Sequence, residues 1–198
     1  MDLYWNMQAI RDEVLENNVV QLRRLSLDDK PGYARIAYDP EIWTYFVSSV
    51  SDEDSLNAFM EQAIHDSLSG TRVVYSIIDR QSEKIAGSTA FGNFASRERR
   101  LEIGWSWLGV QYRGTQINRA VKGLLLDYAF TTLLCERVEF KTDVLNVRAR
   151  RGLEAIGAKE EGTLRSFNYM PNGRRRDAVY YSILKSEWPN VRAERFKG

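Results

Sequence analysis

The sequence predicts an α+β fold in which a mixed, mostly antiparallel sheet of about seven strands carries helices on both faces. Three strand-like runs, residues 71–78, 84–91 and 100–108, are separated by short polar turns, which indicates an antiparallel meander. A strongly apolar helical segment, residues 118–134, then lies between the third run and the next strand. A strand–helix–strand unit of this kind is right-handed, so the two strands that it joins should be parallel.

The length and apolar content favour one domain. The chain has 198 residues, of which 43% are hydrophobic, enough to bury a single sizeable core. We therefore expect one domain over residues 1–198, with residues 1–18 as an N-terminal extension and residues 186–198 as a C-terminal tail. No apolar run approaches the roughly 18 residues of a membrane span, and the first residues lack a basic region followed by an apolar run, so a cytoplasmic protein is expected.

The elements before the meander are predicted from caps and apolar spacing. Residues 19–25 predict a strand that runs into a helix start at residues 26–29, and apolar residues at helical spacing then end before Pro40. Residues 51–54 open a second helix that stops at Gly70. Its apolar face consists of Leu56, Phe59, Met60, Ala63, Ile64 and Leu68.

The elements after the meander follow the same rules. Residues 118–134 are too widely apolar for a surface helix and should pack deep against the sheet. Residues 137–143 alternate strictly between apolar and charged side chains, as a strand does. Asn146 then caps a helix that ends at Gly157, and the strands 159–165 and 177–184 flank a turn at residues 171–173.

Composition excludes several kinds of chemistry. The 28 Lys and Arg residues nearly balance the 27 Asp and Glu residues, so a net charge of +1 gives no overall attraction to nucleic acid or to an anionic membrane. With a single cysteine, Cys135, and a single histidine, His65, neither a disulfide framework nor a Cys/His metal cage can form. We expect no metal, no nucleic-acid partner and no membrane. Cys135 fits a core thiol better than a nucleophile, and His65 fits a surface helix position better than a catalytic one.

One turn has the form of a phosphate site. Residues 111–118 place Gly114 between a strand and the buried helix, so that several backbone N–H groups and the helix N-terminus converge. Arg113 adds a positive charge. Many turns of this kind bind nothing, and this one is neither a P-loop nor a G-x-G-x-x-G fingerprint. The turn alone therefore leaves both interpretations open.

The order of elements and several phrases together resemble the GNAT acetyltransferase superfamily, and more narrowly its RimJ/RimL-type branch. The resemblance covers about residues 19–189 and is densest from residue 100 onward. It is carried by the segments 102–105, 112–115 and 137–143, by Asn146, and by the segments 156–162, 182–184 and 187–189. This resemblance implies a GNAT-like sheet in which the two parallel strands are splayed apart.

The resemblance also implies acetyl-CoA binding at the splayed strands. The pyrophosphate would lie on the turn, here Arg113, Gly114, Thr115, Gln116, Ile117 and Asn118. The pantetheine arm would pair with the strand before the turn, here Trp107, Leu108 and Val110, and would meet Asn146. Arg150 represents the arginines at 148, 150 and 151, one of which should face the phosphates. Asn146 has an equally good role as a helix cap, and the two roles are compatible.

Glu102 is the expected general base for acetyl transfer to an amine. It lies on the third meander strand, where related enzymes place a carboxylate, although a surface ion pair is an equal alternative. Strand alternation puts Glu102, Gly104, Ser106 and Leu108 on one face unless a bulge intervenes. A backbone N–H near Leu108 is the expected oxyanion donor. The acceptor wall implied by the family is aromatic and consists here of Trp43, Tyr45, Phe46 and Trp105, for which core packing is the alternative.

Two departures from the family pattern leave a second function open. Ala149 stands where many relatives carry a serine that protonates the departing sulfur, and Gln116 stands where glycine or alanine is usual. We expect direct acetyl transfer from acetyl-CoA to a primary amine, either a small molecule or a protein or peptide N-terminus, with a homodimer as one open arrangement of the chain. The alternative is a CoA-binding sensor or interaction module with little catalysis. Arginines 174–176 could hold an acidic substrate or the CoA 3′-phosphate, or form a solvated hairpin tip.

Overall fold

The computed structural model describes residue 10 and residues 13–196. Its described strands form a single eight-stranded sheet in the order β1-β2-β3-β4-β5-β6-β8-β7. The parallel contact is between β5 and β6, and the other neighbours are antiparallel, as the sequence predicts. The strands are β1 (Leu15–Glu16), β2 (Val20–Arg24), β3 (Arg72–Asp79), β4 (Lys84–Ala95), β5 (Arg100–Leu108), β6 (Arg137–Asp143), β7 (Lys159–Tyr169) and β8 (Arg175–Leu184).

The two long helices begin and end where the chain supplies the right chemistry. In α3 (Glu53–Ser69), the carboxylate of Asp52 accepts from the Ser55 N–H, and Gly70 takes the left-handed conformation that ends the helix. In α4 (Ile117–Thr131), the apolar face is buried as predicted, at Val121, Leu125, Leu126, Ala129 and Phe130 among others. In the shorter α5 (Val147–Ala155), the Asn146 side chain caps the Ala149 N–H at 3.1 Å.

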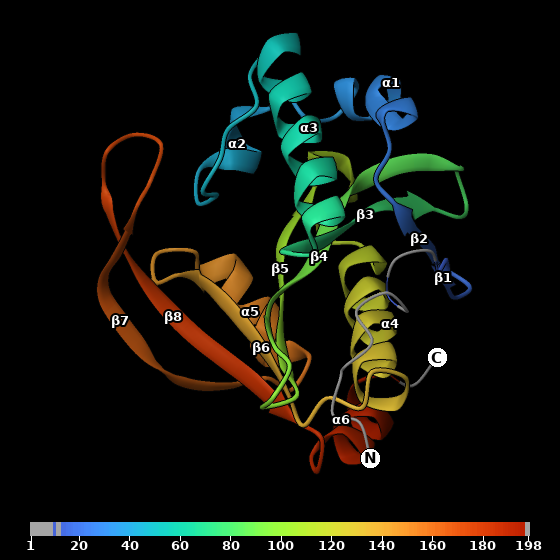
Figure 1. Cartoon of the computed structure of the whole chain (residues 1–198), viewed down its shortest axis with the longest axis vertical. Helices are drawn as coiled ribbons and strands as arrows, with labels where there is room; N and C mark the ends of the chain where they lie inside the picture. Colours follow the sequence, from blue (N-terminus) through green and yellow to red (C-terminus); the bar gives the residue numbers. More distant parts are fainter. Residues whose placement is uncertain (1–9, 11–12, 197–198) are drawn as a thin grey trace.

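Helices cover both faces of the sheet and bury two separate cores (Figure 1). On one face α4 and α5 lie over a large apolar cluster that includes Leu101, Ile103 and Phe140. On the other face α3, together with α1 (Lys30–Ala34) and α2 (Pro40–Trp43), lies over a second cluster. Figure 1 shows β7 and β8 as a long hairpin that extends along one side of the molecule. We call the face that carries α4 the helix-4 face, and the opposite face the α3 face.

The structure differs from the sequence prediction at both ends and in the first helical region. The segment expected as an N-terminal extension contributes β1, which is too short for its alternation to be recognised. The segment expected as a tail contains α6 (Trp188–Arg195), whose Trp188 stacks on Phe130 and is buried. The helix before Pro40 is shorter than predicted, and α2, which begins at Pro40, lies in a stretch where no periodicity is recognisable.

The parallel strands β5 and β6 separate along their length. Their pairing covers residues 100–102 of β5 and 137–139 of β6 and then stops, whereas β6 stays paired with β8 as far as Asp143. From Ile103 onward the edge of β5 that faces β6 therefore has no partner strand among the described residues. An unpaired strand edge offers a row of N–H and C=O groups to an extended ligand.

Candidate active site

Two β-bulges flank Glu102 and decide which side chains reach the same face. On β5, Trp105 and Ser106 together oppose Thr89, and Trp105 has a positive φ of 50°. On β4, Asn93 also has a positive φ, at 49°, next to a second register shift. A bulge inserts one residue and re-aims the side chains around it. The two bulges therefore orient the residues around Glu102.

The bulge at Trp105 interrupts the alternation predicted from the sequence. Glu102 and Gly104 lie on the α3 face, but Ser106 bonds to Lys122 of α4 and Leu108 packs on the cluster under α4. Trp105 and Trp107 do share a face, as expected, because the bulge moves both of them onto the α3 face. The expected run of four residues on one face is therefore wrong after Gly104.

Glu102 is held by one of its two carboxylate oxygens. Asn93 donates to Oε2 at 2.6 Å, and the Lys141 ammonium donates to the same oxygen at 3.3 Å. The residue is only 4% exposed, and Oε1 accepts no hydrogen bond from the described residues. A methyl group added at Gly104 would lie 2.8 Å from Oε1, so the missing side chain leaves room for this oxygen. A buried carboxylate with one fixed and one free oxygen is well arranged to accept a proton.

A cavity of about 680 Å³ opens beside Glu102 on the α3 face. Strands β4 to β8 contribute its lining, which includes Asn93, Arg100, Glu102, Glu139, Leu164 and Tyr180. The second carboxylate, Glu139, is paired through both oxygens, with Arg100 and with Arg137. Glu102 is therefore the cavity carboxylate that retains a free oxygen.

The turn before α4 presents free N–H groups, as the sequence suggests. Gly114 adopts a positive φ of 73° with open space around its Cα, a conformation that suits glycine. The Thr115 hydroxyl donates to the Tyr112 carbonyl at 2.7 Å and fixes the turn. The N–H groups of Gly114, Thr115 and Gln116 have no acceptor among the described residues. They lie at the positive end of α4, where an anion is stabilised.

The arginine nearest this turn differs from the expected one. Desolvation and the positive charge of Arg148 lower the pKa of Arg113, which also pairs with Glu41 at 3.5 Å. Arg150 instead bonds to the Tyr181 hydroxyl, the Val144 carbonyl and Glu160. Two cations that repel each other next to free N–H groups form a site for a polyanion, and Arg148 fits this role better than Arg150.

The expected aromatic wall is partly core. Trp43 is buried against Trp107 and Phe46, and its indole N–H donates to the Ala37 carbonyl at 2.7 Å. Trp105 is half-buried and lies under the Arg72 guanidinium, with the Arg72 Cζ 5.0 Å from its ring centre. Tyr45 is also half-buried. Trp43 therefore has a packing role, while Trp105 and Tyr45 keep some exposed surface.

Sequence reasoning missed Lys122, which is 5% exposed. Its ammonium donates to Ser106 Oγ at 2.8 Å and lies 5.5 Å from the ring centre of Phe140. Ser106 is on β5 and Phe140 on β6, both beyond the point where these strands separate, so Lys122 lies under the gap from the helix-4 face. Burial lowers the pKa of Lys122 to about 7, although the negative charge of Glu102 opposes this shift. A lysine in the middle of an apolar stripe was the signal available in the sequence.

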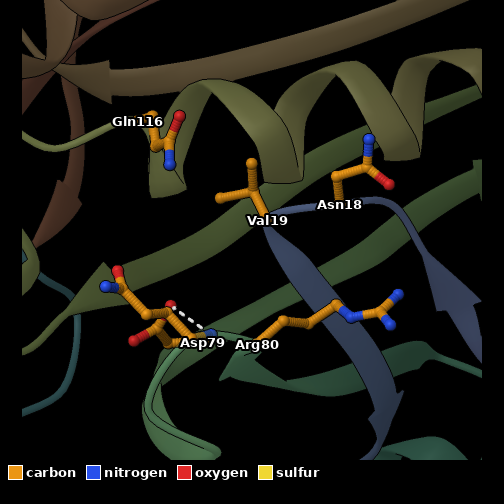
Figure 2. A pocket seen from close by; sticks show the side chains of 6 residues that line it. Asn18, Val19, Asp79, Arg80 and Gln116 are labelled. Atoms are coloured by element: carbon orange, nitrogen blue, oxygen red, sulfur yellow. Dashed lines mark hydrogen bonds between the residues drawn. The ribbon is translucent and has the colours of Figure 1, made fainter.

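A second hollow lies away from Glu102, beside the start of α4. Figure 2 shows Gln116 above a pocket bordered by Asn18 and Val19 of the β1–β2 connection and by Asp79 and Arg80. Its volume is about 420 Å³. It contains no unpaired buried carboxylate. We therefore assign it no role in the chemistry.

The remaining sequence candidates have structural surroundings. Cys135 is buried, and burial raises the pKa of its thiol to about 12, which suits a core thiol. His65 is exposed on α3. Among the described residues no three His, Cys, Asp or Glu side chains gather as metal ligands, and no described helix is long and apolar enough to span a membrane.

The splayed parallel strands, the glycine turn at a helix N-terminus and the helices on both faces define the GNAT fold class. Comparison with known proteins extends this result. The model of the acetyltransferase (GNAT) domain matches residues 20–159. The chain therefore belongs to the GNAT acetyltransferase family.

Individual relatives agree. The Uncharacterized N-acetyltransferase p20 of Bacillus licheniformis is 29% identical over 177 residues, covering 89% of this chain and 98% of p20. The "Putative ribosomal N-acetyltransferase YdaF" of Bacillus subtilis is 38% identical over 104 residues, 52% of this chain and 56% of YdaF, which supports the resemblance to the RimJ/RimL-type branch.

Solved structures show the same fold. A crystal structure of an acetyltransferase from T. thermophilus superposes with a TM-score of 0.85 at 35% identity, covering 93% of this chain and 95% of the other. Mycobacterium smegmatis RimJ in complex with CoA-disulfide gives a TM-score of 0.77 at 22% identity, with 93% and 91% covered. At that identity the RimJ comparison bears on the fold alone.

Proposed function

We propose that this protein is an acetyl-CoA-dependent N-acetyltransferase that moves the acetyl group directly to a primary amine. The observation that carries this proposal is the buried Glu102 carboxylate, whose Oε1 has no partner among the described residues and which lines a cavity beside the separated strands. The description of the B. subtilis relative as a ribosomal N-acetyltransferase supports a protein N-terminus as one acceptor, beside small amines.

The residues present fit acetyl-CoA. The free N–H groups of Gly114, Thr115 and Gln116, with Arg113 and Arg148 close by, would hold the phosphates. The open edge of β5 from Ile103 to Leu108 would pair with the amides of the pantetheine arm. Acetyl-CoA would supply the acetyl group as a thioester.

The chain supplies a group for each proton and charge of direct transfer. As the new N–C bond forms and the C–S bond breaks, the amine must lose a proton, which Glu102 Oε1 is placed to take. Backbone N–H groups on the open edge of β5 would stabilise the carbonyl oxygen. Because residue 149 is alanine, the Lys122 ammonium under the gap is our candidate to stabilise or protonate the leaving thiolate.

The test is Glu102→Gln, which keeps the shape and removes the base. We expect kcat to fall about 100-fold or more, while the rise in melting temperature with acetyl-CoA is unchanged, because Glu102 lies away from the phosphate turn. Glu139→Gln is the matched control, since it changes a carboxylate of the same cavity that is paired through both oxygens. Equal turnover in wild type and Glu102→Gln would remove Glu102 from the mechanism.

The alternative, a CoA-binding module with little catalysis, is separated by the same materials. Wild-type protein that is stabilised by acetyl-CoA but releases no CoA with a broad panel of amines and N-terminal peptides would support that alternative. Release of CoA that depends on an amine and on Glu102 would exclude it.

A further inference from the structure

The guanidinium of Arg176 is buried without a partner among the described residues. Arg176 is 5% exposed, and its Nε is fully buried with no hydrogen-bond partner. Its side chain forms no hydrogen bond or ion pair with the described part of the chain, whereas its neighbours Arg174 and Arg175 form both or one of these. Buried guanidinium groups are normally paired, because removing the charge from water without compensation is costly.

Nearby carboxylates are already engaged by other cations. The charges of Asp143 and Glu102 act on Arg176, so both lie near it. However, Arg174 donates to Asp143, and Lys141 donates to Glu102. Three cations and two carboxylates therefore share this region, which leaves one positive charge uncompensated. The other charged side chains of the cavity floor balance, because Arg100 and Arg137 pair with Glu139 and Glu161.

The residue opposite Arg176 is also incompletely satisfied. Asn168 is its cross-strand partner on β7, and the Asn168 Oδ1 is a buried acceptor without a donor among the described residues. The Asn168 amide nitrogen donates instead to the Tyr169 carbonyl at 2.8 Å. Even if Oδ1 turned toward Arg176, an amide would supply a hydrogen bond and no charge. The site would still lack an anion.

We propose that Arg176 binds a carboxylate of the acceptor, so that the substrate class is a primary amine that also carries a carboxylate. This inference rests on the proposed function for the amine and on Arg176 for the carboxylate. A single negative charge balances the region, and a guanidinium matches a carboxylate with two parallel hydrogen bonds. Alternation along β8 places Arg176 on the same face as Tyr180, which lines the cavity of Glu102. The acceptor would then lie with its amine toward Glu102 and its carboxylate toward Arg176.

The first experiment compares acceptors that differ only in the charge of one group. Glycine, β-alanine and 4-aminobutyrate are each compared with the corresponding carboxamide, as are the dipeptides Gly-Glu and Gly-Gln, by the rate of CoA release. We expect kcat/KM to favour the carboxylate by about 30-fold or more for the best chain length in wild type, and this preference to disappear in Arg176→Gln. Arg175→Gln is the matched control, because the Arg175 side chain bonds to Ser166 and stacks on Tyr169. It should keep the preference.

The second experiment needs no turnover. N-acetyl-β-alanine should raise the melting temperature of wild type and of Arg175→Gln more than N-acetyl-β-alaninamide does, and it should not do so for Arg176→Gln. The melting temperature of ligand-free Arg176→Gln should not fall, since the variant removes an uncompensated buried charge. This measurement also shows whether the variant folds.

The outcomes separate the two proposals. Carboxylate-dependent stabilisation without acetylation of any amine would overturn the proposed function and leave the carboxylate site standing. Acetylation with equal preference for carboxylate and carboxamide in wild type, or a preference that survives Arg176→Gln, would overturn the carboxylate site.

Discussion

The turn before α4 and the cavity around Glu102 are two ends of one candidate site, but they are built in different ways. The turn is a single continuous segment, residues 110–118, whose free N–H groups follow from a local conformation. The cavity is assembled from five strands, and its residues are far apart in the sequence. A local motif tolerates loss of one charge, whereas an assembled carboxylate depends on each neighbour that positions it. Changes at the cavity should therefore affect turnover, and changes at the turn should affect cofactor affinity.

The largest expected effect comes from Gly104→Ala. The new methyl group would lie 2.8 Å from Glu102 Oε1 and would force the carboxylate to move. Because a displacement of about 1 Å can cost 100-fold in rate, we expect kcat to fall about 100-fold with little change in acetyl-CoA affinity, as measured by steady-state kinetics.

Gly152→Ala is the control for that experiment. It makes the same chemical change on α5, where the added methyl group would be 3.9 Å from the nearest atom, the Asn118 Nδ2. It should raise the free energy of unfolding by about 0.5–1 kcal/mol and leave kcat unchanged. A Gly104→Ala enzyme with full turnover would contradict the dependence of Glu102 on its neighbours.

An intermediate effect is expected from Lys122→Met, since Lys122 belongs to the helix of the turn but lies under the gap. The pKa of Lys122 is about 7 in the folded protein and about 10.4 when unfolded, so below about pH 7 it is charged in both states and its burial is fully destabilising. Above that pH the unfolded chain binds more protons, and the free energy of unfolding should rise by about 1.4 kcal/mol per pH unit.

The clearest window for this measurement is about pH 7 to 8.5, because the buried thiol of Cys135 opposes the trend above its unfolded pKa of about 8.5. Lys122→Met should be about 2 kcal/mol more stable than wild type at pH 7 and should lack the slope, as measured by urea unfolding. Lys84→Met, at an exposed position, should retain it. A wild-type stability that is flat over this window would show that Lys122 is not a buried ammonium.

The smallest expected effect is at the turn. Arg113→Gln should raise the KM for acetyl-CoA about tenfold, because it removes one charge-assisted contact, with kcat nearly unchanged. Arg148→Gln should act in the same direction, and Arg165→Gln, at an exposed position of β7, should have no effect. A fall in kcat with an unchanged KM would place Arg113 at the acceptor end instead.

The same contrast explains what could be predicted from the sequence. The meander, the parallel strand pair, the buried helix and the caps at Asn146 and Gly70 follow from local spacing, and the structure confirms them. Glu102 was recognised by its place on β5, but Asn93, Lys141 and Arg176 were not, because each reaches it from a different strand. Arg176 was considered only as one of three arginines at a hairpin tip, and nothing local distinguishes its burial from the exposure of Arg175. The two bulges are also invisible locally, because Asn93 and Trp105 adopt left-handed conformations that no glycine announces.

The extra residue at Trp105 works like a frameshift within one strand. Upstream of it, even-numbered residues of β5 belong to the α3 face, and downstream of it odd-numbered residues do. When relatives are aligned by strand position, one that lacks the insertion would have Trp107 and Ser106 exchanged between faces. A single deletion at residue 105 would therefore move an indole into the layer of Lys122 and a hydroxyl into the aromatic layer, although every other residue of the strand stayed the same.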